Sequence, residues 1–126
     1  MAYQTLLIRK EAGVDWVTMN RPERLNALNT TLVDELQDYF GRLYTDHATR
    51  IVVLRGAGKG YCAGLDLKER GNSDETSDRG PVTGLRRQRA ISEIVMRMRR
   101  CPQPIVSLVH GAACGGGFAF ALASDI

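Results

Sequence analysis

Three consecutive glycines, Gly115 to Gly117, interrupt an apolar stretch and constrain the fold more than any other feature of the chain. Before them, the β-branched run from Ile105 to Val109 predicts a buried strand; after them, the segment from Phe118 to Ala123 predicts a buried helix. Glycine costs roughly 0.5–1 kcal/mol relative to alanine in regular structure, so a triplet indicates that another group approaches the main chain closely. The N–H groups of the first helical turn would then be able to bind an oxyanion.

Two purely structural explanations compete with this one. The stretch from Ile105 to Ala123 is nearly long enough to cross a membrane, and Gly111 and Gly115 have the spacing of a helix-dimerisation motif. His110 and the glycines suit a lipid-facing helix poorly, so we expect no contact with a membrane. A tight turn without a function is the other alternative, and a second feature of the chain is needed to decide against it.

Length and composition limit the class of protein. A chain of 126 residues with 44% hydrophobic and 25% charged residues forms at most one soluble domain. Its net charge of +3 suits an anionic small ligand but is too small to indicate nucleic acid. Cys62, Cys101 and Cys114 form no CxxC pair and have no histidine at ligand spacing, which indicates buried reduced thiols in a cytoplasmic protein and no metal site. The N-terminus has no secretory signal.

Hydrophobic patterning predicts an α/β fold. Strands are predicted over residues 5–9 and 14–19, which form a hairpin, and over residues 51–54, a continuous apolar run typical of a strand covered on both faces. Helices are predicted over residues 32–43 and 85–100, and another helix begins at Leu65. The polar segment from Gly71 to Gly84 is predicted to be a surface loop.

Two strand, turn and helix units follow from this pattern, one around Gly64 and one around Gly116. Each could deliver a backbone N–H group to one point, which is the second feature that a functional turn requires. Residues 58–63 also match the dinucleotide pattern GxGxxG/A, but no strand ending in an acidic residue follows at the distance that a Rossmann unit requires. We therefore expect no binding of NAD.

The helix predicted over residues 85–100 carries six arginines. A basic amphipathic helix can bind nucleic acid or an acidic lipid surface, but a solvated face explains the same pattern. Because no aromatic residue is interleaved for base stacking, we expect no nucleic-acid site.

Three blocks of sequence together resemble the enoyl-CoA hydratase/isomerase (crotonase) superfamily: residues 20–28 (NRPERLNAL), residues 60–67 (GYCAGLDL) and the stretch from Pro102 to Gly117. The resemblance covers the chain as the N-terminal portion, residues 1–126, of a single acyl-CoA-binding domain. It implies a crotonase-like ββα spiral of repeated strand, turn and helix units, here truncated. The chain ends where a new strand is predicted to begin, and we expect the domain to continue.

The same resemblance assigns residues to a site. The thioester carbonyl of an acyl-CoA would accept hydrogen bonds from the backbone N–H groups of Leu65 and Gly116. Contacts with the substrate would come from Arg24, Ala27, Ala63, Gly64, Asp66 and Leu67. The resemblance implies no cofactor besides the coenzyme A of the substrate, and a homo-oligomer, either a trimer or a hexamer.

Position 119 departs from the pattern of the family's hydratases. They carry a glutamate three residues after the middle glycine, where this chain has Ala119, and their second glutamate would lie beyond Ile126. A single carboxylate suits a double-bond isomerase better than a hydratase, which must activate water and protonate carbon. The alternative is a non-catalytic or truncated acyl-CoA-binding fragment that lacks the general acid and base. In either case, we expect residues 1–126 alone to be inactive.

Overall fold

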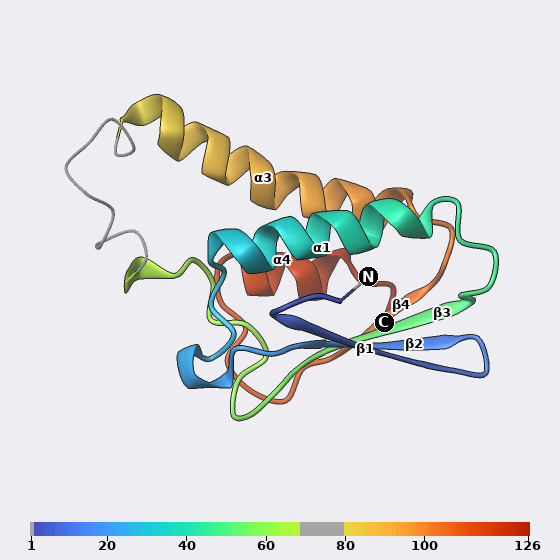
Figure 1. Cartoon of the computed structure of the whole chain (residues 1–126). Coiled ribbons are helices and arrows are strands. Elements are labelled where there is room, and N and C mark those ends of the chain that lie inside the picture. Colours follow the sequence, from blue (N-terminus) through green and yellow to red (C-terminus); the bar gives the residue numbers. More distant parts are fainter. Residues whose placement is uncertain (1, 69–79) are drawn as a thin grey trace.

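The computed structural model describes residues 2–68 and 80–126, which form one four-stranded sheet with helices over one face (Figure 1). The strands are β1 (Leu6–Glu11), β2 (Val14–Met19), β3 (Ile51–Gly56) and β4 (Ile105–Leu108). The helices are α1 (Thr30–Leu43), α3 (Pro81–Arg100) and α4 (Gly116–Ala123), with a short 3₁₀ helix over Pro22–Arg24. The predicted α/β class is confirmed.

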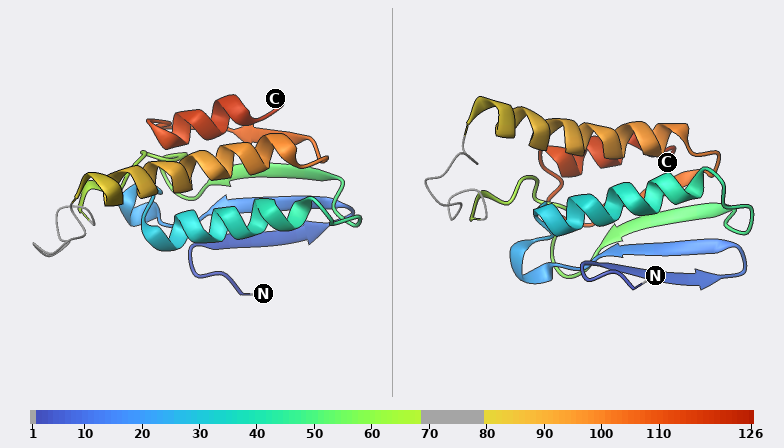
Figure 2. Two further views of the ribbon diagram at one scale, coloured as in Figure 1. Left: turned by 90° about the horizontal axis from the view of Figure 1, so that it is seen from above. Right: turned by 45° about the horizontal axis from the view of Figure 1, so that its top comes forward.

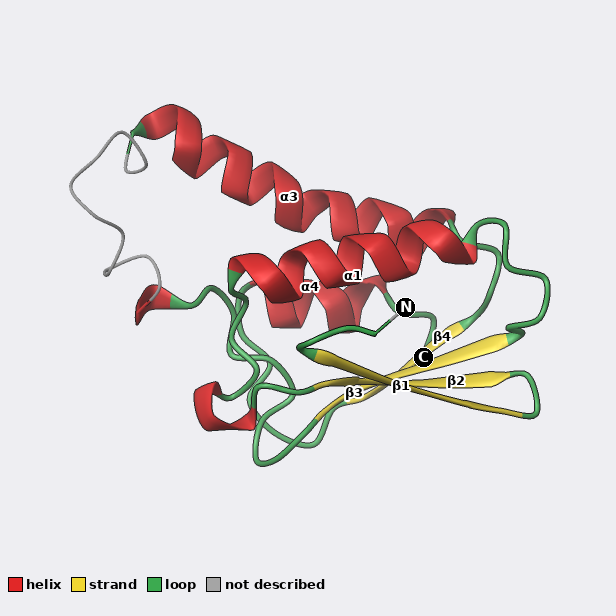
Figure 3. Cartoon of the chain, in the orientation of Figure 1, coloured by secondary structure: helices red, strands yellow, loops and turns green. Residues whose placement is uncertain are grey.

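The strands follow one another across the sheet in the order β1, β2, β3, β4. The predicted hairpin is confirmed, since β1 and β2 pair antiparallel with Ile8 opposite Val17. β2, β3 and β4 pair parallel, with Val17 opposite Leu54 and Val52 opposite Ile105. The carboxyl ends of these three strands therefore meet at one end of the sheet, and Figure 3 shows the connecting loops gathered there.

Helix α1 begins at Thr30, two residues before the predicted start at Leu32. The side chain of Asn29 accepts a hydrogen bond from the N–H of Leu32 at 2.8 Å, which satisfies one of the unpaired donors of the first turn. One face of the helix is buried, including Leu32, Leu36 and Phe40. α1, α3 and α4 lie side by side over the sheet (Figure 2), and the main hydrophobic core fills the space between the two layers.

All three described helices cover the same face of the sheet. Val52 and Leu54 point into the core. On the opposite face Trp16 lies between the guanidinium groups of Arg9 and Arg55, at 5.2 and 5.0 Å from its ring. Val53, which alternates with Val52 and Leu54, is also buried, so the prediction that this strand is covered on both faces holds for residues 52–54.

The loop predicted from Gly71 to Gly84 is only partly testable, because residues 71–79 lie outside the described residues. Its last part is wrong: α3 begins at Pro81, four residues before the predicted start at Leu85. Proline is favoured in the first turn of a helix because its missing N–H has no helical partner there. The proline and glycines that indicated a loop are therefore compatible with the beginning of a helix.

Candidate functional site

Two glycine turns touch each other at the carboxyl end of the sheet. Gly64 has φ +94° and Gly115 has φ +51°, a region of backbone conformation that side chains disfavour. A Cβ atom on Gly64 would stand 2.9 Å from the carbonyl oxygen of Cys114, and one on Gly115 would stand 3.8 Å from the Cα of Gly64. The absence of side chains allows the two backbones to meet.

Two isolated β-bridges outside the main strands hold these turns together. Leu28 forms a parallel bridge with Leu65, and Cys62 forms one with Ala113. In the second bridge, the N–H of Cys114 donates to the carbonyl of Cys62 at 3.0 Å. The segment containing residues 62–65 therefore lies between the segment that leads into α1 and the segment that leads into α4.

The bridge to Leu28 determines where the N–H of Leu65 points. Leu28 donates to the carbonyl of Gly64 at 2.7 Å and accepts from the N–H of Asp66 at 3.0 Å. In a parallel pairing, the residue opposite then turns its own N–H to the other side. The N–H of Leu65 consequently points away from Leu28, on the side where the segment before α4 lies.

Gly116 supplies the second donor. It is the first residue of α4, so its N–H has no partner within the helix. Among residues 2–68 and 80–126, neither this N–H nor that of Leu65 donates a hydrogen bond to the protein. Two unsatisfied donors on adjoining turns are suited to an anionic or strongly polarised oxygen.

Both donors border one cavity of about 580 Å³. α3 contributes a stripe at helical spacing, and α4 contributes Ala119. The described lining residues are Leu65, Gln88, Ile91, Ser92, Val95, Met96, Gly115, Gly116 and Ala119. None of these is acidic, so the described lining offers hydrogen-bond donors and apolar surface but no carboxylate base.

The residues expected to contact the substrate lie on two adjacent segments, residues 24–27 and 63–67. Arg24 is exposed at the end of the 3₁₀ helix, and Leu67 is 71% exposed. Ala27 is buried, and Ala63 donates its N–H to the carbonyl of Leu25 at 3.0 Å, which connects the two segments. The carboxylate of Asp66 is buried inside the protein, and its partners are described below.

Sequence analysis missed the residues that assemble this region. Asn26 is fully buried; its amide nitrogen donates to the carbonyls of Ala57 and Gly60, each at 2.9 Å, and its side-chain oxygen accepts from the N–H of Arg21 at 2.8 Å. Its φ of +58° is one that asparagine tolerates better than most residues. The only indication in the sequence was that a polar residue, Asn26, stands between Pro22 and an apolar run.

The prediction of buried thiols is right for Cys62 and wrong for Cys114, which is exposed; Cys101 is intermediate. Cys62 lies in a paired segment beneath α4, whereas Cys114 lies in the turn before that helix, where the side chain faces outward. Burial raises the pKa of the Cys62 thiol to about 11. All three thiols are free.

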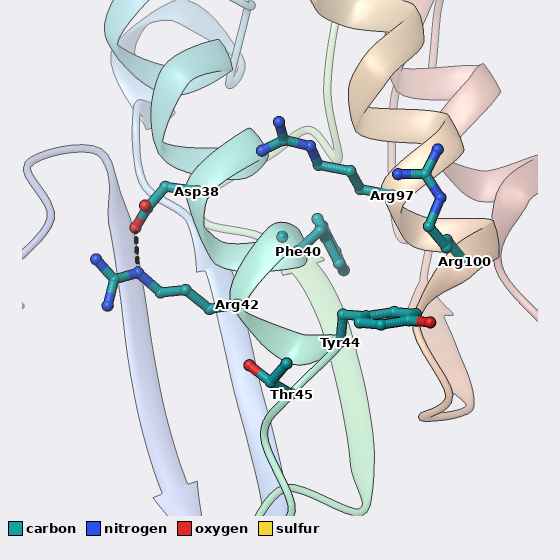
Figure 4. A pocket seen from close by; sticks show the side chains of 9 residues that line it. Asp38, Phe40, Arg42, Tyr44, Thr45, Arg97 and Arg100 are labelled. Atoms are coloured by element: carbon teal, nitrogen blue, oxygen red, sulfur yellow. Dashed lines mark hydrogen bonds and ion pairs between the residues drawn. The ribbon is translucent and has the colours of Figure 1, made fainter.

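A second cavity, of about 620 Å³, lies away from the glycine turns, between the C-terminal ends of α1 and α3 (Figure 4). Arg42, Arg97 and Arg100 line it. Arg97 pairs with Glu93 at 2.9 Å and donates to the carbonyl of Gln37 at 2.7 Å. Cations near the last turn also offset the negative end of a helix dipole, so this arginine cluster has a structural explanation.

The sequence profile of the enoyl-CoA hydratase/isomerase family matches residues 9–126. The chain belongs to this family. It is 38% identical to the 1,2-epoxyphenylacetyl-CoA isomerase of Escherichia coli, over 96% of this chain and 45% of that relative. Members of the family are enzymes, and the matched relatives include hydratases, isomerases and a hydratase-lyase.

Solved structures of the family have the same fold. Pseudomonas aeruginosa AtuE superposes with a TM-score of 0.90 and 35% identity, covering 98% of this chain and 46% of that one. An enoyl-CoA hydratase/isomerase from Xanthobacter autotrophicus Py2 has a TM-score of 0.89 and 31% identity, covering 99% and 45%. The crotonase-like fold is thus confirmed, and the chain spans less than half the length of these relatives.

Over the part of the chain that the structure describes, no helix is both long and apolar enough to cross a membrane. The same residues contain no group of three or more His, Cys, Asp or Glu side chains placed to hold a metal ion.

Proposed function

We propose that the protein processes acyl-CoA thioesters and stabilises a thioester enolate with the N–H groups of Leu65 and Gly116. The observation that carries this proposal is that two backbone donors, for which the described residues supply no acceptor, lie on touching turns at the border of one cavity. A base removes a proton from the carbon next to the thioester carbonyl, and negative charge develops on the carbonyl oxygen. Each preorganised donor at such an oxygen typically contributes about 2.7–4 kcal/mol to the transition state.

Position 119 favours isomerisation over hydration. Ala119 borders the same cavity as both donors, so a glutamate there would reach the reacting atoms, whereas a methyl group cannot move a proton. One carboxylate is enough to take a proton from one carbon and return it to another. By resemblance to the family's hydratases, we expect that carboxylate after Ile126. The Escherichia coli relative is named as an isomerase of a CoA thioester.

A second candidate function is acyl-CoA binding without catalysis. It is favoured by the lack of any carboxylate among the described residues that line the cavity. Turnover of an acyl-CoA substrate by the intact protein would exclude this candidate, and saturable binding without turnover would favour it.

The remaining parts of the proposal rest on the family resemblance. Residues 1–126 are the N-terminal portion of a single acyl-CoA-binding domain that acts in the cytoplasm as a trimer or hexamer. Arg24, Ala27, Ala63, Gly64, Asp66 and Leu67 form its contacts with the substrate. The chemistry uses backbone donors and one carboxylate, so it needs no metal and no cofactor besides the coenzyme A of the substrate. No part of it involves nucleic acid or a membrane.

Titration calorimetry of the intact protein tests the proposal. We expect saturable binding of crotonyl-CoA or butyryl-CoA and no binding of NADH, because the second strand of a dinucleotide-binding unit is not present in the sequence. Binding of NADH without binding of either thioester would reject the assignment.

A further inference from the structure

Arg21 and Asp66 form an ion pair that is almost completely buried. The Nη2 of Arg21 lies 3.0 Å from the Oδ2 of Asp66, and the two side chains are 13% and 7% exposed. Exposed ion pairs contribute little because water screens them, but a buried pair that is broken leaves an uncompensated charge. The pair therefore constrains the segments that carry its two members.

The guanidinium group of Arg21 holds both sides of the bridge between Leu28 and Leu65. Its Nη1 donates to the carbonyl of Ala27, the residue before Leu28, and its Nη2 binds Asp66, the residue after Leu65. A planar fork of donors can make both contacts at once, which the single ammonium of a lysine does less well.

The carboxylate of Asp66 also fixes the chain on the far side of Leu65. Its Oδ1 accepts from the N–H of Lys68 at 3.0 Å, at the beginning of the helical turn that follows. Leu65 is therefore held by its bridge on one side and by the anchored carboxylate of the next residue. The rotation of the peptide that carries its N–H is restricted by both.

From these contacts we infer that Arg21 and Asp66 are a positioning pair: they hold the Leu65 N–H in the direction required for the proposed oxyanion site and do not themselves touch the reacting atoms. The inference rests on the proposed function. It gives the side chain of Asp66 a role inside the protein, in addition to any contact that the residue makes with the substrate through its main chain.

The test compares Arg21→Lys, Arg21→Met and Asp66→Asn in the intact protein. Glu11→Gln is the matched control, because it breaks the exposed ion pair between Arg9 and Glu11. We expect kcat to fall about 10- to 100-fold in the Arg21 and Asp66 variants, with little change in KM, since a small displacement of a catalytic group has an effect of this size. The control should keep the wild-type kcat.

Two spectroscopic readouts separate positioning from a loss of stability. The infrared stretch of the thioester carbonyl in bound crotonyl-CoA shifts less from its free value if a donor is misplaced. Amide exchange at Leu28, whose N–H donates to the carbonyl of the peptide that carries the Leu65 N–H, should become about 10-fold faster or more in Asp66→Asn, while exchange at Trp16 in β2 stays unchanged. Arg21→Lys keeps the charge and serves as the deciding variant if Arg21→Met does not fold.

Folded Arg21→Lys and Asp66→Asn proteins with wild-type kcat, carbonyl frequency and Leu28 exchange would overturn the inference. A wild-type protein that binds no acyl-CoA, but whose Leu28 exchange still depends on Asp66, would instead reject the proposed function and leave the positioning of Leu65 intact. The two failures are therefore distinguishable.

Discussion

The carbonyl oxygen of Cys114 lies so close to Gly64 that a Cβ atom on Gly64 would be only 2.9 Å from it. Because both groups belong to backbone, neither can move aside as the end of a side chain could. Alanine at position 64 would also have to adopt φ +94°, which by itself costs roughly 1–2 kcal/mol.

We therefore expect Gly64→Ala to destabilise the protein by about 2–4 kcal/mol and to abolish binding of acyl-CoA. Gly84→Ala is the matched control, since no atom lies within 4 Å of a Cβ atom at that position in α3. The control should stabilise the helix by about 0.5–1 kcal/mol. Urea denaturation measures both effects, and equal midpoints for Gly64→Ala and wild type would show that the turns do not need to touch.

The donor at Gly116 can be removed without removing the helix. Gly116 is the first residue of α4, a position where proline is well tolerated. Gly116→Pro should lower kcat by about 10²–10³-fold through loss of the N–H group.

Gly116→Ala controls for added bulk, because its Cβ atom would meet the side chains of Leu28 at 2.6 Å and Ile91 at 3.3 Å but would keep the donor. These side-chain ends can shift, so we expect alanine to retain most of the activity. Steady-state kinetics of both variants separates the two effects. Equal losses in the two variants would mean that space, and not the hydrogen bond, is what the site requires.

Ala119 should limit the reaction to single-base chemistry. Wild-type protein is expected to hydrate crotonyl-CoA weakly or not at all, and Ala119→Glu should raise the rate of hydration by about 10²–10⁴-fold, the usual contribution of a general acid or base. Leu122→Glu, on the same helix but 69% exposed, places a carboxylate away from the cavity and should have no effect. The absorbance of the enoyl thioester follows the reaction. Efficient hydration by the wild type would show that another residue supplies the second proton transfer.

Cys62 and Cys114 should differ in reactivity. The thiolate is the reactive form, and at pH 8 a Cys62 thiol with a pKa of about 11 is almost entirely protonated as well as buried. Iodoacetamide should therefore label the exposed Cys114 first and Cys62 only after unfolding, which mass spectrometry of peptides can follow. Rapid labelling of Cys62 in the native protein would contradict this.

The raised pKa of Cys62 also has a consequence for stability. The folded state holds the thiol proton more tightly than the unfolded chain does, so the contribution of Cys62 to the free energy of unfolding should be constant below about pH 9 and should fall as pH rises toward 11. Burial likewise raises the pKa of Tyr61 to about 12, which extends the fall to higher pH. Cys62→Ala should show a smaller decrease between these pH values.

Local patterns predicted the regular elements well. The apolar face of α1 and the β1–β2 hairpin both depend on residues close in sequence, and both are confirmed. The start of α3 was misplaced because Pro81 and Gly84 are typical of loops as well as of helix beginnings.

The assembly of the site could not be predicted from patterning in the same way. Arg21 and Asp66 are separated by 45 positions, and no periodicity connects an ion pair of this kind. Asp15 illustrates the same limit: its carboxylate is buried beneath α1 and accepts from the hydroxyl of Tyr39 at 2.6 Å, although its place in β2 gave no sign of a partner. The glycine turns were identified because glycine is informative by itself, whereas the polar groups that hold them depend on the completed fold.

The bridges that form the site also determine when it can form. Asn26 reaches the carbonyl of Gly60 across 34 positions, and the pairing of Cys62 with Ala113 spans a longer interval still. Each of these contacts closes a long loop, which costs conformational entropy that a local hairpin does not lose. Contacts between residues so distant in sequence also slow folding. During synthesis on the ribosome, the hairpin and α1 can form early, but the two donors cannot adjoin until residues beyond Gly116 have left the exit tunnel. The proposed oxyanion site can therefore form only after Gly116 has emerged, and a nascent chain stalled before that point would have the hairpin and α1 but no site.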